Sequence, residues 1–226
     1  IIFFYGVAVG RYEIFPFQII KMVRDNFVPK YICPKGNVKT FNTFCLPKLI
    51  SPRANVVFIG DSLTKNGRWI DFLPNHKIVN RGVSGYTTSD LSKNINFILA
   101  TKPKKVFIMI GINDVMKNIP ISSILKNYEL IIDSLIETNI EVIIQSTIQC
   151  EASLCGIKNV NSINTLNEVL SNLAVSKEIT FLNLEALSDV AGLDSTFSED
   201  GIHLTTKAYI YWAEKIKTQL SSSKIS

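Results

Sequence analysis

Histidine is scarce in this chain, which has only two among 226 residues, His76 and His203. They are not paired at a ligand spacing, and no cluster of metal-binding residue types accompanies them, which argues against a catalytic zinc site. Glycine-rich nucleotide loops are lacking as well, because the Gly82–Gly85 segment does not have the spacing of a dinucleotide fingerprint. These absences favour a chemistry that needs neither a metal ion nor a nucleotide cofactor.

Charge is also sparse. Charged residues make up 19% of the chain, and the formal net charge is only +5. The densest basic cluster, Lys102, Lys104 and Lys105, directly precedes an apolar run and is typical of a solvated loop. No nucleic-acid partner is therefore expected. With 46% hydrophobic residues, the chain is long enough for one α/β domain with a sizeable core.

No apolar run reaches the roughly 20 residues that a membrane span requires. The longest begins the chain, Ile1 to Val9, without an initiating Met, which indicates a processed or cut chain. We favour an anchor remnant that associates with a membrane, since nearby aromatic residues suit an interface. Arg11, Lys21 and Arg24 follow the run and point to the cytoplasmic side instead. The alternative is an amphipathic segment packed on the domain or on a partner.

The four cysteines form two close pairs, Cys33 with Cys45 and Cys150 with Cys155. An even number of cysteines is consistent with disulfide bonds. Four cysteines can pair in three ways, and we favour these two bridges because each closes a short local loop. The pairs predict an extracytoplasmic location, on the periplasmic or secreted side. Four reduced cysteines in a cytoplasmic enzyme are the alternative.

Composition divides the chain into four segments. Residues 1–28 form the apolar N-terminal segment, and residues 29–54 form a linker punctuated by Pro and Gly. The main folded domain is expected over residues 55–220, before a polar tail at 221–226. Nothing in the sequence indicates the oligomeric state.

Apolar runs alternate with helical periodicity in the predicted domain. Strands are expected at Val56–Ile59, Ile78–Val79, Val106–Ile110, Val142–Gln145 and Thr180–Leu182. Helices are expected at Thr88–Leu99, Ile121–Glu137, Ile163–Ala174 and Thr205–Leu220. This alternation predicts a five-stranded parallel sheet in a three-layer α/β/α sandwich, with an extra apolar or helical segment at the N-terminus.

Gly60-Asp61-Ser62-Leu63 directly follows the first predicted strand. A serine that leaves a parallel strand lies at the carboxyl edge of the sheet, where open α/β sheets place their sites. Two further blocks, Asn80 to Gly85 and Gly111 to Asp114, also follow apolar runs. A fourth block, Asp200 to Leu204, lies near the C-terminus. Their order is more specific than any single motif.

The residue types of these blocks suit nucleophilic catalysis. A serine hydroxyl needs a base, and His203 is the candidate because imidazole titrates near neutral pH. Asp200, three residues earlier, can orient the imidazole; a turn or N-cap role is its alternative, and Glu199 is a weaker competitor. His76 is interpreted as a solvated loop residue.

Neighbouring features complete this interpretation. Asp61 and Asp114 are expected to brace their own turns through backbone amides. The long connection from Thr147 to Asn161 contains Cys150 and Cys155, and we expect their bridge to stiffen a wall of the substrate pocket.

On these four blocks the chain resembles the SGNH/GDSL hydrolases, from about Val56 to Ala213. The resemblance implies a flavodoxin-like fold and a catalytic triad of Ser62, Asp200 and His203. It also implies an oxyanion hole made by the backbone N–H of Ser62, the backbone N–H of Gly82 and the side-chain amide of Asn113. No cofactor and no metal are implied.

The function implied by this resemblance is hydrolysis of a carboxylic ester through an acyl-Ser62 intermediate. We expect a small acyl group, such as acetyl, on a glycan. The alternatives are an O-acyltransferase with the same site, a lysophospholipase or thioesterase, and a non-catalytic binding module of the same fold.

Overall fold

The computed structural model describes residues 54–222. The predicted N-terminal anchor remnant, the linker and the Cys33–Cys45 bridge fall outside these residues, apart from the last linker residue, and they stay predictions. Among the described residues, no helix is both long and apolar enough to cross a membrane.

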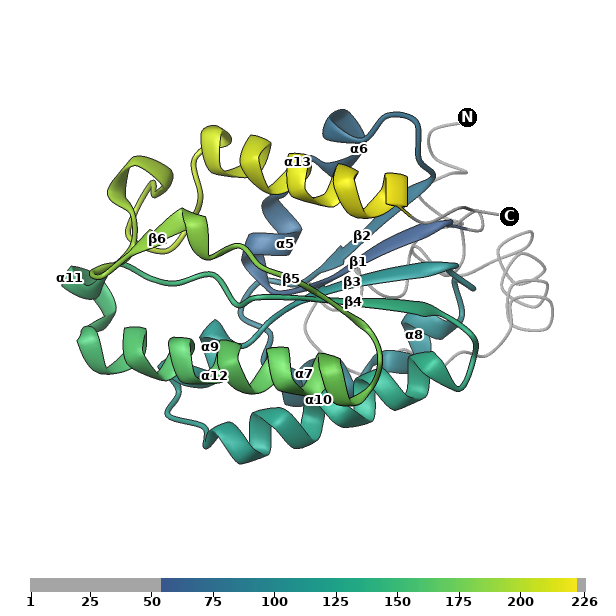
Figure 1. The fold of residues 1–226 in the computed structure, drawn as a ribbon, viewed down its shortest axis with the longest axis horizontal. Helices are drawn as coiled ribbons and strands as arrows, with labels where there is room; N and C mark the ends of the chain where they lie inside the picture. The colour runs from purple at the N-terminus through teal and green to yellow at the C-terminus, as the bar shows by residue number, and fades with distance from the viewer. Residues whose placement is uncertain (1–53, 223–226) are drawn as a thin grey trace, which may run out of the picture. The chain divides into compact units, whose positions relative to one another are not determined.

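A five-stranded parallel sheet forms the centre of the domain, with the strand order β2-β1-β3-β4-β5 (Figure 1). The strands are β1 Val56–Gly60, β2 Ile78–Gly82, β3 Lys105–Met109, β4 Glu141–Gln145 and β5 Thr180–Leu182. All five lie within a few residues of the apolar runs that predict them. Their near-continuous apolar character follows from burial on both faces. The predicted three-layer, flavodoxin-like α/β/α fold is confirmed.

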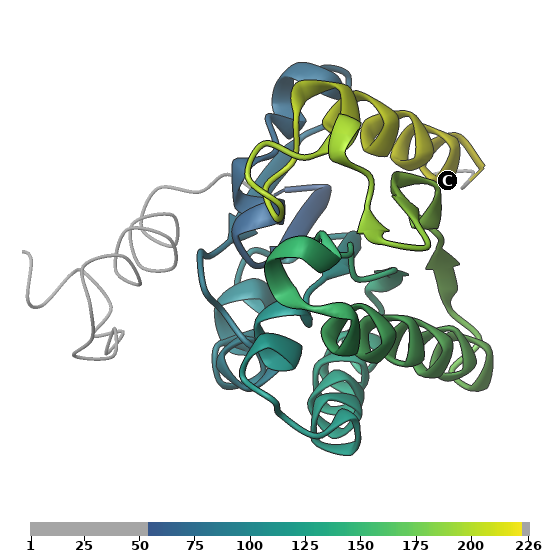
Figure 2. The ribbon, with the colours of Figure 1, turned by 90° about the vertical axis from the view of Figure 1, so that its left-hand side faces the viewer.

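Helices cover both faces of the sheet (Figures 1 and 2). One face carries α6 (Trp69–Phe72) and α13 (Thr206–Ser222). The other carries α7 (Thr88–Lys93), α8 (Ile95–Leu99), α10 (Ile121–Ile136) and α12 (Ile157–Ser176). Three short helices lie beyond the carboxyl ends of the strands: α5 (Ser62–Asn66), α9 (Ile112–Met116) and α11 (Ala152–Cys155). The remaining elements lie between β5 and α13: a hairpin of β6 (Ser188–Asp189) with β7 (Gly192–Leu193), and two 3₁₀ turns, Glu185–Leu187 and Ser195–Phe197.

Two of the predicted helices differ from the structure. The segment Thr88–Leu99 is broken at Asn94, whose side-chain amide donates to the Asp90 carbonyl at 2.7 Å. An Asn side chain that bonds nearby backbone competes with the helical ladder, which accounts for the break. The helix expected from Ile163 begins earlier, at Ile157, directly after Gly156. The predicted loop Thr147 to Asn161 is therefore wrong in part, because α11 and the first turn of α12 occupy much of it.

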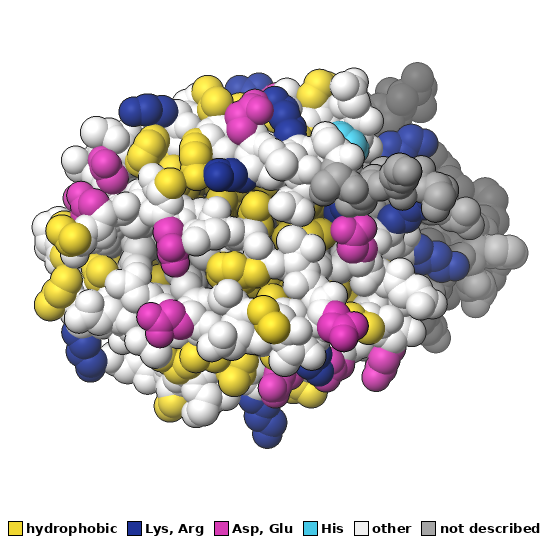
Figure 3. Space-filling model, in the orientation of Figure 1, with side chains coloured by type: hydrophobic (Ala, Val, Ile, Leu, Met, Phe, Trp, Pro, Cys, Tyr) yellow, Lys and Arg dark blue, Asp and Glu magenta, His cyan; other side chains and the backbone are white. Residues whose placement is uncertain are grey.

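Each face of the sheet has its own apolar core. Between the sheet and α13, Trp69 stacks on Phe58 and meets Trp212 edge-on, each pair with ring centroids 4.7 Å apart. Aliphatic side chains of α7, α10 and α12 fill the other face. Charged side chains of both signs are interspersed on the face drawn in Figure 3. The two cores hold the sheet rigidly, so the loops at its carboxyl edge start from fixed points.

The register of the strands brings the predicted blocks together. Gly60 at the end of β1 is level with Gly82 at the end of β2 and with Met109 at the end of β3. The residues that follow these ends therefore emerge side by side at one edge, which faces the viewer in Figure 2.

Candidate active site

Ser62 is the first residue of α5 and follows β1 after a single residue, Asp61. The Asp61 carboxylate caps this helix, because its Oδ1 accepts the Leu63 N–H at 2.9 Å. The cap agrees with the expected bracing of the turn. This cap places Ser62, which is half-buried, in the first turn of α5. Backbone N–H groups in the first turn of a helix have no partner within the helix.

His203 lies in the loop before α13, and its Nε2 is 3.3 Å from Ser62 Oγ. The other ring nitrogen, Nδ1, is 2.7 Å from Asp200 Oδ2. The structure thus brings three predicted residues, 141 positions apart at the widest pair, into one hydrogen-bonded chain. The His203 side chain is 37% exposed and that of Asp200 is 56% exposed, so this half of the site borders solvent.

Asp200 plays both of the parts that the sequence leaves open. Its Oδ1 accepts the backbone N–H groups of Ile202 at 3.1 Å and His203 at 2.8 Å, as in a capped turn. Its Oδ2 is left for the imidazole. These bonds, first to the His203 side chain and then to its backbone, lower the pKa of Asp200 to about 2. The carboxylate therefore stays ionised beside His203 at neutral pH.

The hydrogen bonds of the His203 ring within residues 54–222 go to Ser62 and Asp200, and not to Glu199 or His76. Glu199 is bonded to the loop through its backbone N–H, 2.8 Å from the His203 carbonyl oxygen. His76 lies in the turn before β2, where its N–H donates to the Leu73 carbonyl at 3.1 Å. Because that turn enters β2, His76 is at the amino edge of the sheet, the edge opposite Ser62.

The expected role of Gly82 in an oxyanion hole conflicts with its surroundings. Its backbone N–H already donates to Asn80 Oδ1 at 2.9 Å, and the residue is buried. A Cβ at this position would lie 2.3 Å from the Lys65 backbone nitrogen. Gly82 is therefore glycine because β2 ends against the backbone of α5, and it has no free donor for a substrate. This part of the sequence prediction is corrected.

Gly85, three residues later, has the properties that Gly82 lacks. It is exposed, its φ is +78°, and a Cβ there would meet nothing within 4 Å. Positive φ favours glycine, and an open backbone lets a ligand approach closely. The sequence block contains both glycines, and only the packing of α5 distinguishes them. The signal that could have found Gly85 is its position in a turn immediately after the buried Val83.

Asn113 lies in α9, and its side-chain Nδ2 donates to the carbonyl of Tyr86 at 3.0 Å. This bond ties the amide to the turn that carries Gly85. An Asn amide has two N–H donors, so the second is left for another acceptor. Asn113 is half-buried at the carboxyl edge of the sheet, on the same edge as Ser62.

Asp114 differs from its expected role, since it braces a distant turn rather than its own. Both of its carboxylate oxygens accept the Thr88 N–H, at 3.1 and 3.0 Å, and Oδ1 also accepts the Thr88 hydroxyl at 2.6 Å. Burial raises the pKa of Asp114, although these bonds oppose the shift. Together with Asn113, it clamps the turn from Gly85 to Thr88 onto α9.

Asn80 is a positioning residue that the sequence prediction does not assign. Its side-chain amide donates to three carbonyls around the end of α5, those of Thr64, Lys65 and Gly67, at 2.9 to 3.2 Å. Its Oδ1 accepts the Gly82 N–H. One amide thus joins β2 to the helix that presents Ser62. The signal was available, because Asn80 opens the same sequence block.

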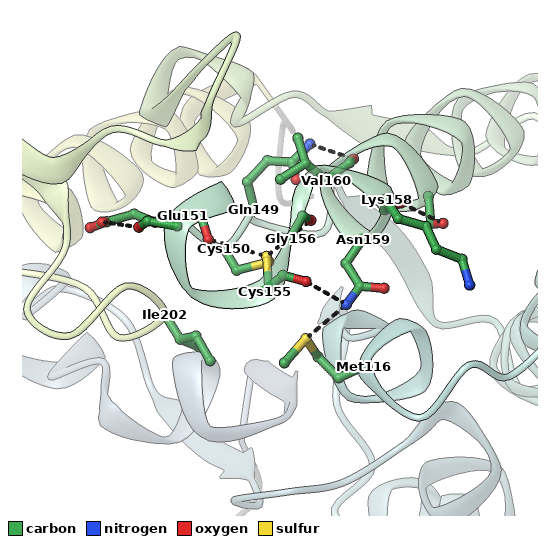
Figure 4. The surroundings of a disulfide bond; sticks show 12 residues. Met116, Gln149, Cys150, Glu151, Cys155, Gly156, Lys158, Asn159, Val160 and Ile202 are labelled. Atoms are coloured by element: carbon green, nitrogen blue, oxygen red, sulfur yellow. Dashed lines mark hydrogen bonds between the residues drawn. A yellow bond between two sulfur atoms is a disulfide. The ribbon is translucent and has the colours of Figure 1, made fainter.

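The Cys150–Cys155 disulfide is present, as predicted (Figure 4). The disulfide closes a ring of residues 150–155, and this ring contacts the loop that carries His203. Within the ring, the Glu151 N–H donates to the Gly201 carbonyl at 2.8 Å. The Leu154 side chain lies against the Gly201 α-carbon, at the site where a Cβ would be 2.8 Å from its Cδ2. Ile202 and Cys155 both pack against the apolar core on the α7, α10 and α12 face of the sheet. The ring supports the segment between Asp200 and His203.

Comparisons with known proteins identify the family of the chain. Residues 58–209, well over half of the chain, match the model of the GDSL-like lipase/acylhydrolase family. An N-acylneuraminate cytidylyltransferase of Streptococcus agalactiae is 24% identical over 209 residues, which cover 89% of this chain and 48% of that protein. The chain thus spans about half the length of the curated relatives that it matches.

Solved structures share the fold. A putative acylhydrolase from Bacteroides fragilis superposes with a TM-score of 0.74 at 20% identity, covering 83% of this chain and 98% of that one. An acetylxylan esterase from Geobacillus stearothermophilus has a TM-score of 0.63 at 19% identity, with coverage of 75% and 95%. At these identities the likeness concerns the fold.

Proposed function

We propose that this chain, which belongs to the GDSL-like lipase/acylhydrolase family, is an ester-bond hydrolase. It removes a small acyl group, such as acetyl, from a glycan through an acyl-Ser62 intermediate. The observation that carries this proposal is the chain of contacts from Ser62 Oγ to His203 Nε2, at 3.3 Å, and from His203 Nδ1 to Asp200 Oδ2, at 2.7 Å.

In the first half of the reaction, Ser62 Oγ attacks the ester carbonyl carbon and His203 Nε2 takes the hydroxyl proton. The tetrahedral intermediate then breaks its bond to the alcohol oxygen, and the imidazolium returns the proton to that oxygen. In the second half, water attacks the acyl-Ser62 ester with His203 again as base. Asp200 holds the imidazole in the tautomer with a proton on Nδ1 and stabilises the imidazolium.

The developing oxyanion needs donors that are fixed in advance. We assign this role to the Ser62 backbone N–H, the Gly85 backbone N–H and the free N–H of the Asn113 amide. Ser62 stands at a helix start, where such N–H groups lack helical partners. Gly85 is open and exposed, and the Tyr86 carbonyl ties Asn113 to the same turn. Gly82 is replaced in this role because its N–H is bonded to Asn80.

An acylated sugar is the substrate class that the relatives favour. One structural neighbour is an acetylxylan esterase, and the curated relatives are named for an N-acylneuraminate, which is also an acylated sugar. The two groups of relatives are named for different reactions, ester hydrolysis and cytidylyl transfer, and what their names share is an acylated sugar. The names describe those proteins, and for this chain they support a proposal only.

The Cys150–Cys155 bridge supports an extracytoplasmic location. Disulfides persist in oxidising compartments and are rare in the cytosol. Acylated glycans of the cell envelope would be accessible there.

A chain-length series tests the reaction. The purified protein is assayed with p-nitrophenyl esters from acetyl to long acyl, beside Ser62→Ala. We expect the highest kcat/KM for acetyl, and a loss of at least about 10⁴-fold in Ser62→Ala at an unchanged melting temperature. A fluorophosphonate probe should label the wild type and not the variant. Preference for long acyl chains would overturn the small-acyl assignment, and folded protein that neither turns over nor labels would overturn the mechanism.

A further inference from the structure

A cavity of about 470 Å³ adjoins His203. Its lining comes from two segments, residues 66–72 around α6 and residues 199–209 at the start of α13. These segments lie together on one face of the sheet (Figure 1), where α6 contacts α13. The volume falls within the range of about 300–1,000 Å³ that is usual for small-ligand sites.

The cavity lies on the side of the reaction where the alcohol leaves. In a tetrahedral intermediate, the oxyanion points to its donors and the departing oxygen must reach the acid that protonates it. His203 is that acid in the proposed mechanism, and it lines the cavity. The proposed oxyanion donors Gly85 and Asn113 belong to the turn after β2 and to α9, outside the two lining segments. An alcohol that leaves toward His203 would therefore enter the cavity.

The polar lining groups suit hydroxyls rather than a charged group. Arg68 Nε donates to Asp71 Oδ2 at 2.5 Å, so the guanidinium already has a carboxylate partner. Glu199 adds a second carboxylate, which makes the lining acidic on balance. Asn66 and Thr206 supply an amide and a hydroxyl. Such a set accepts and donates many hydrogen bonds, and two carboxylates against one guanidinium favour a neutral ligand over an anion.

The apolar part of the lining completes the match with a sugar. Phe72 is half-buried and Leu204 is buried, so they present fixed carbon surface beside the polar groups. Tyr209 is committed elsewhere, because its hydroxyl donates to the Leu63 carbonyl at 2.8 Å. A sugar ring has hydroxyls at its edge and apolar C–H groups on its faces, and a cavity with both kinds of lining can hold it.

We propose that this cavity is the subsite for the alcohol part of the ester and that it selects a neutral sugar, with Asp71, Phe72 and Glu199 as specificity-determining residues. The assignment rests on the proposed esterase function. Glu199, a weak competitor for the catalytic role in the sequence, thus takes a different part: its carboxylate binds hydroxyls next to the imidazole that Asp200 orients.

The test compares two acetyl esters that differ in the alcohol. One is p-nitrophenyl acetate, and the other is an acetylated xylo-oligosaccharide. For Phe72→Ala and Glu199→Gln, we expect the ratio of kcat/KM for the sugar ester to that for p-nitrophenyl acetate to fall at least about 10-fold, mainly through KM. Glu168→Gln removes an exposed carboxylate on α12, away from the lining, and should leave the ratio unchanged.

A binding measurement separates the subsite from the chemistry. Deacetylated xylo-oligosaccharide should inhibit p-nitrophenyl acetate hydrolysis competitively in the wild type and at least about 10-fold more weakly in the two variants. An unchanged ratio in both variants, or stronger inhibition by the anionic N-acetylneuraminate than by the neutral sugar, would overturn the proposed subsite and leave the esterase standing. Loss of all ester turnover in the wild type would instead remove the proposed function itself.

Discussion

Asp61, beside the proposed nucleophile, is fully buried, whereas Asp200, beside the proposed base, is more than half exposed. Burial raises the pKa of Asp61 to about 7, and its Oδ2 has no hydrogen-bond partner among the described residues. Hydrogen bonds to His203 lower the pKa of Asp200 to about 2. The two aspartates thus differ in environment and in charge: Asp61 is part of the core, whereas Asp200 stays ionised beside the imidazole of His203.

The two regions are also held in place by different means. The Ser62 turn is enclosed by β1, α5 and the Asn80 amide, so core packing determines its position. The His203 loop is open to solvent and depends on local bonds: the Asp200 turn, the Ser198 hydroxyl, which accepts the Gly201 N–H at 2.7 Å, and the disulfide ring behind it. Substitutions that disturb the packing around the Ser62 turn should therefore lower the stability of the fold, whereas substitutions in the His203 loop should mainly lower turnover.

Among the changes that probe the two aspartates and the bridge, the largest expected effect is on turnover, for Asp200→Asn. The amide cannot stabilise the imidazolium and can favour the wrong tautomer, so kcat/KM should fall about 10³-fold, or about 4 kcal/mol. The free energy of unfolding at pH 7 should change by less than about 1 kcal/mol, because the carboxylate is exposed and screened. Esterase assays and urea unfolding test this, and a variant that keeps at least about a tenth of wild-type activity would contradict the role.

The next effect is on the pH dependence of stability, for Asp61→Asn. The folded pKa of Asp61 is raised from 3.8 to about 7, so its stabilising contribution is present below pH 3.8 and lost as the pH rises through about 7. The wild type should lose about 2 to 4 kcal/mol more than the variant between pH 4 and pH 8. Unfolding curves across this range measure the difference, and parallel profiles would show that Asp61 titrates normally.

The smallest effect is expected for Cys150→Ala with Cys155→Ala. Opening so short a ring should cost about 2 kcal/mol of stability. The Glu151–Gly201 bond and the Leu154 contact would loosen, so kcat should fall about 10-fold. The preference for the alcohol part of the ester should change little, since neither cysteine lines the cavity beside His203. For this cavity, the prediction differs from the expectation that the bridge stiffens a wall of the substrate pocket.

A matched control separates the bridge from its surroundings. Ser153→Ala changes an exposed side chain within the same ring and should leave kcat within about 2-fold. Wild-type protein treated with dithiothreitol should behave like the double variant. A kcat that is unaffected by loss of the bridge would mean that the His203 loop does not depend on it.

Much of the fold follows from local patterns. The five strands are predictable because each is a short apolar run, which burial on both faces of a parallel sheet requires. Ser62 and His203 are recognisable from their sequence blocks. The break at Asn94 is harder to predict from the sequence, because it depends on one side-chain hydrogen bond. The early start of α12 is also harder to predict, because it depends on whether an additional helical turn can pack against the rest of the domain.

The sequence by itself determined the layers of the fold, the residues of the proposed triad and the Cys150–Cys155 pairing, since these depend on periodicity, motif order and loop length. Only the tertiary structure decided between Gly82 and Gly85, because burial of one depends on how α5 packs against the end of β2. The hydrogen bonds between Asp114 and Thr88, and the position of Glu199 in the same cavity as Phe72, are likewise visible only in the tertiary structure. Such contacts join segments far apart in the chain, and the spacing of residues within one segment does not encode them.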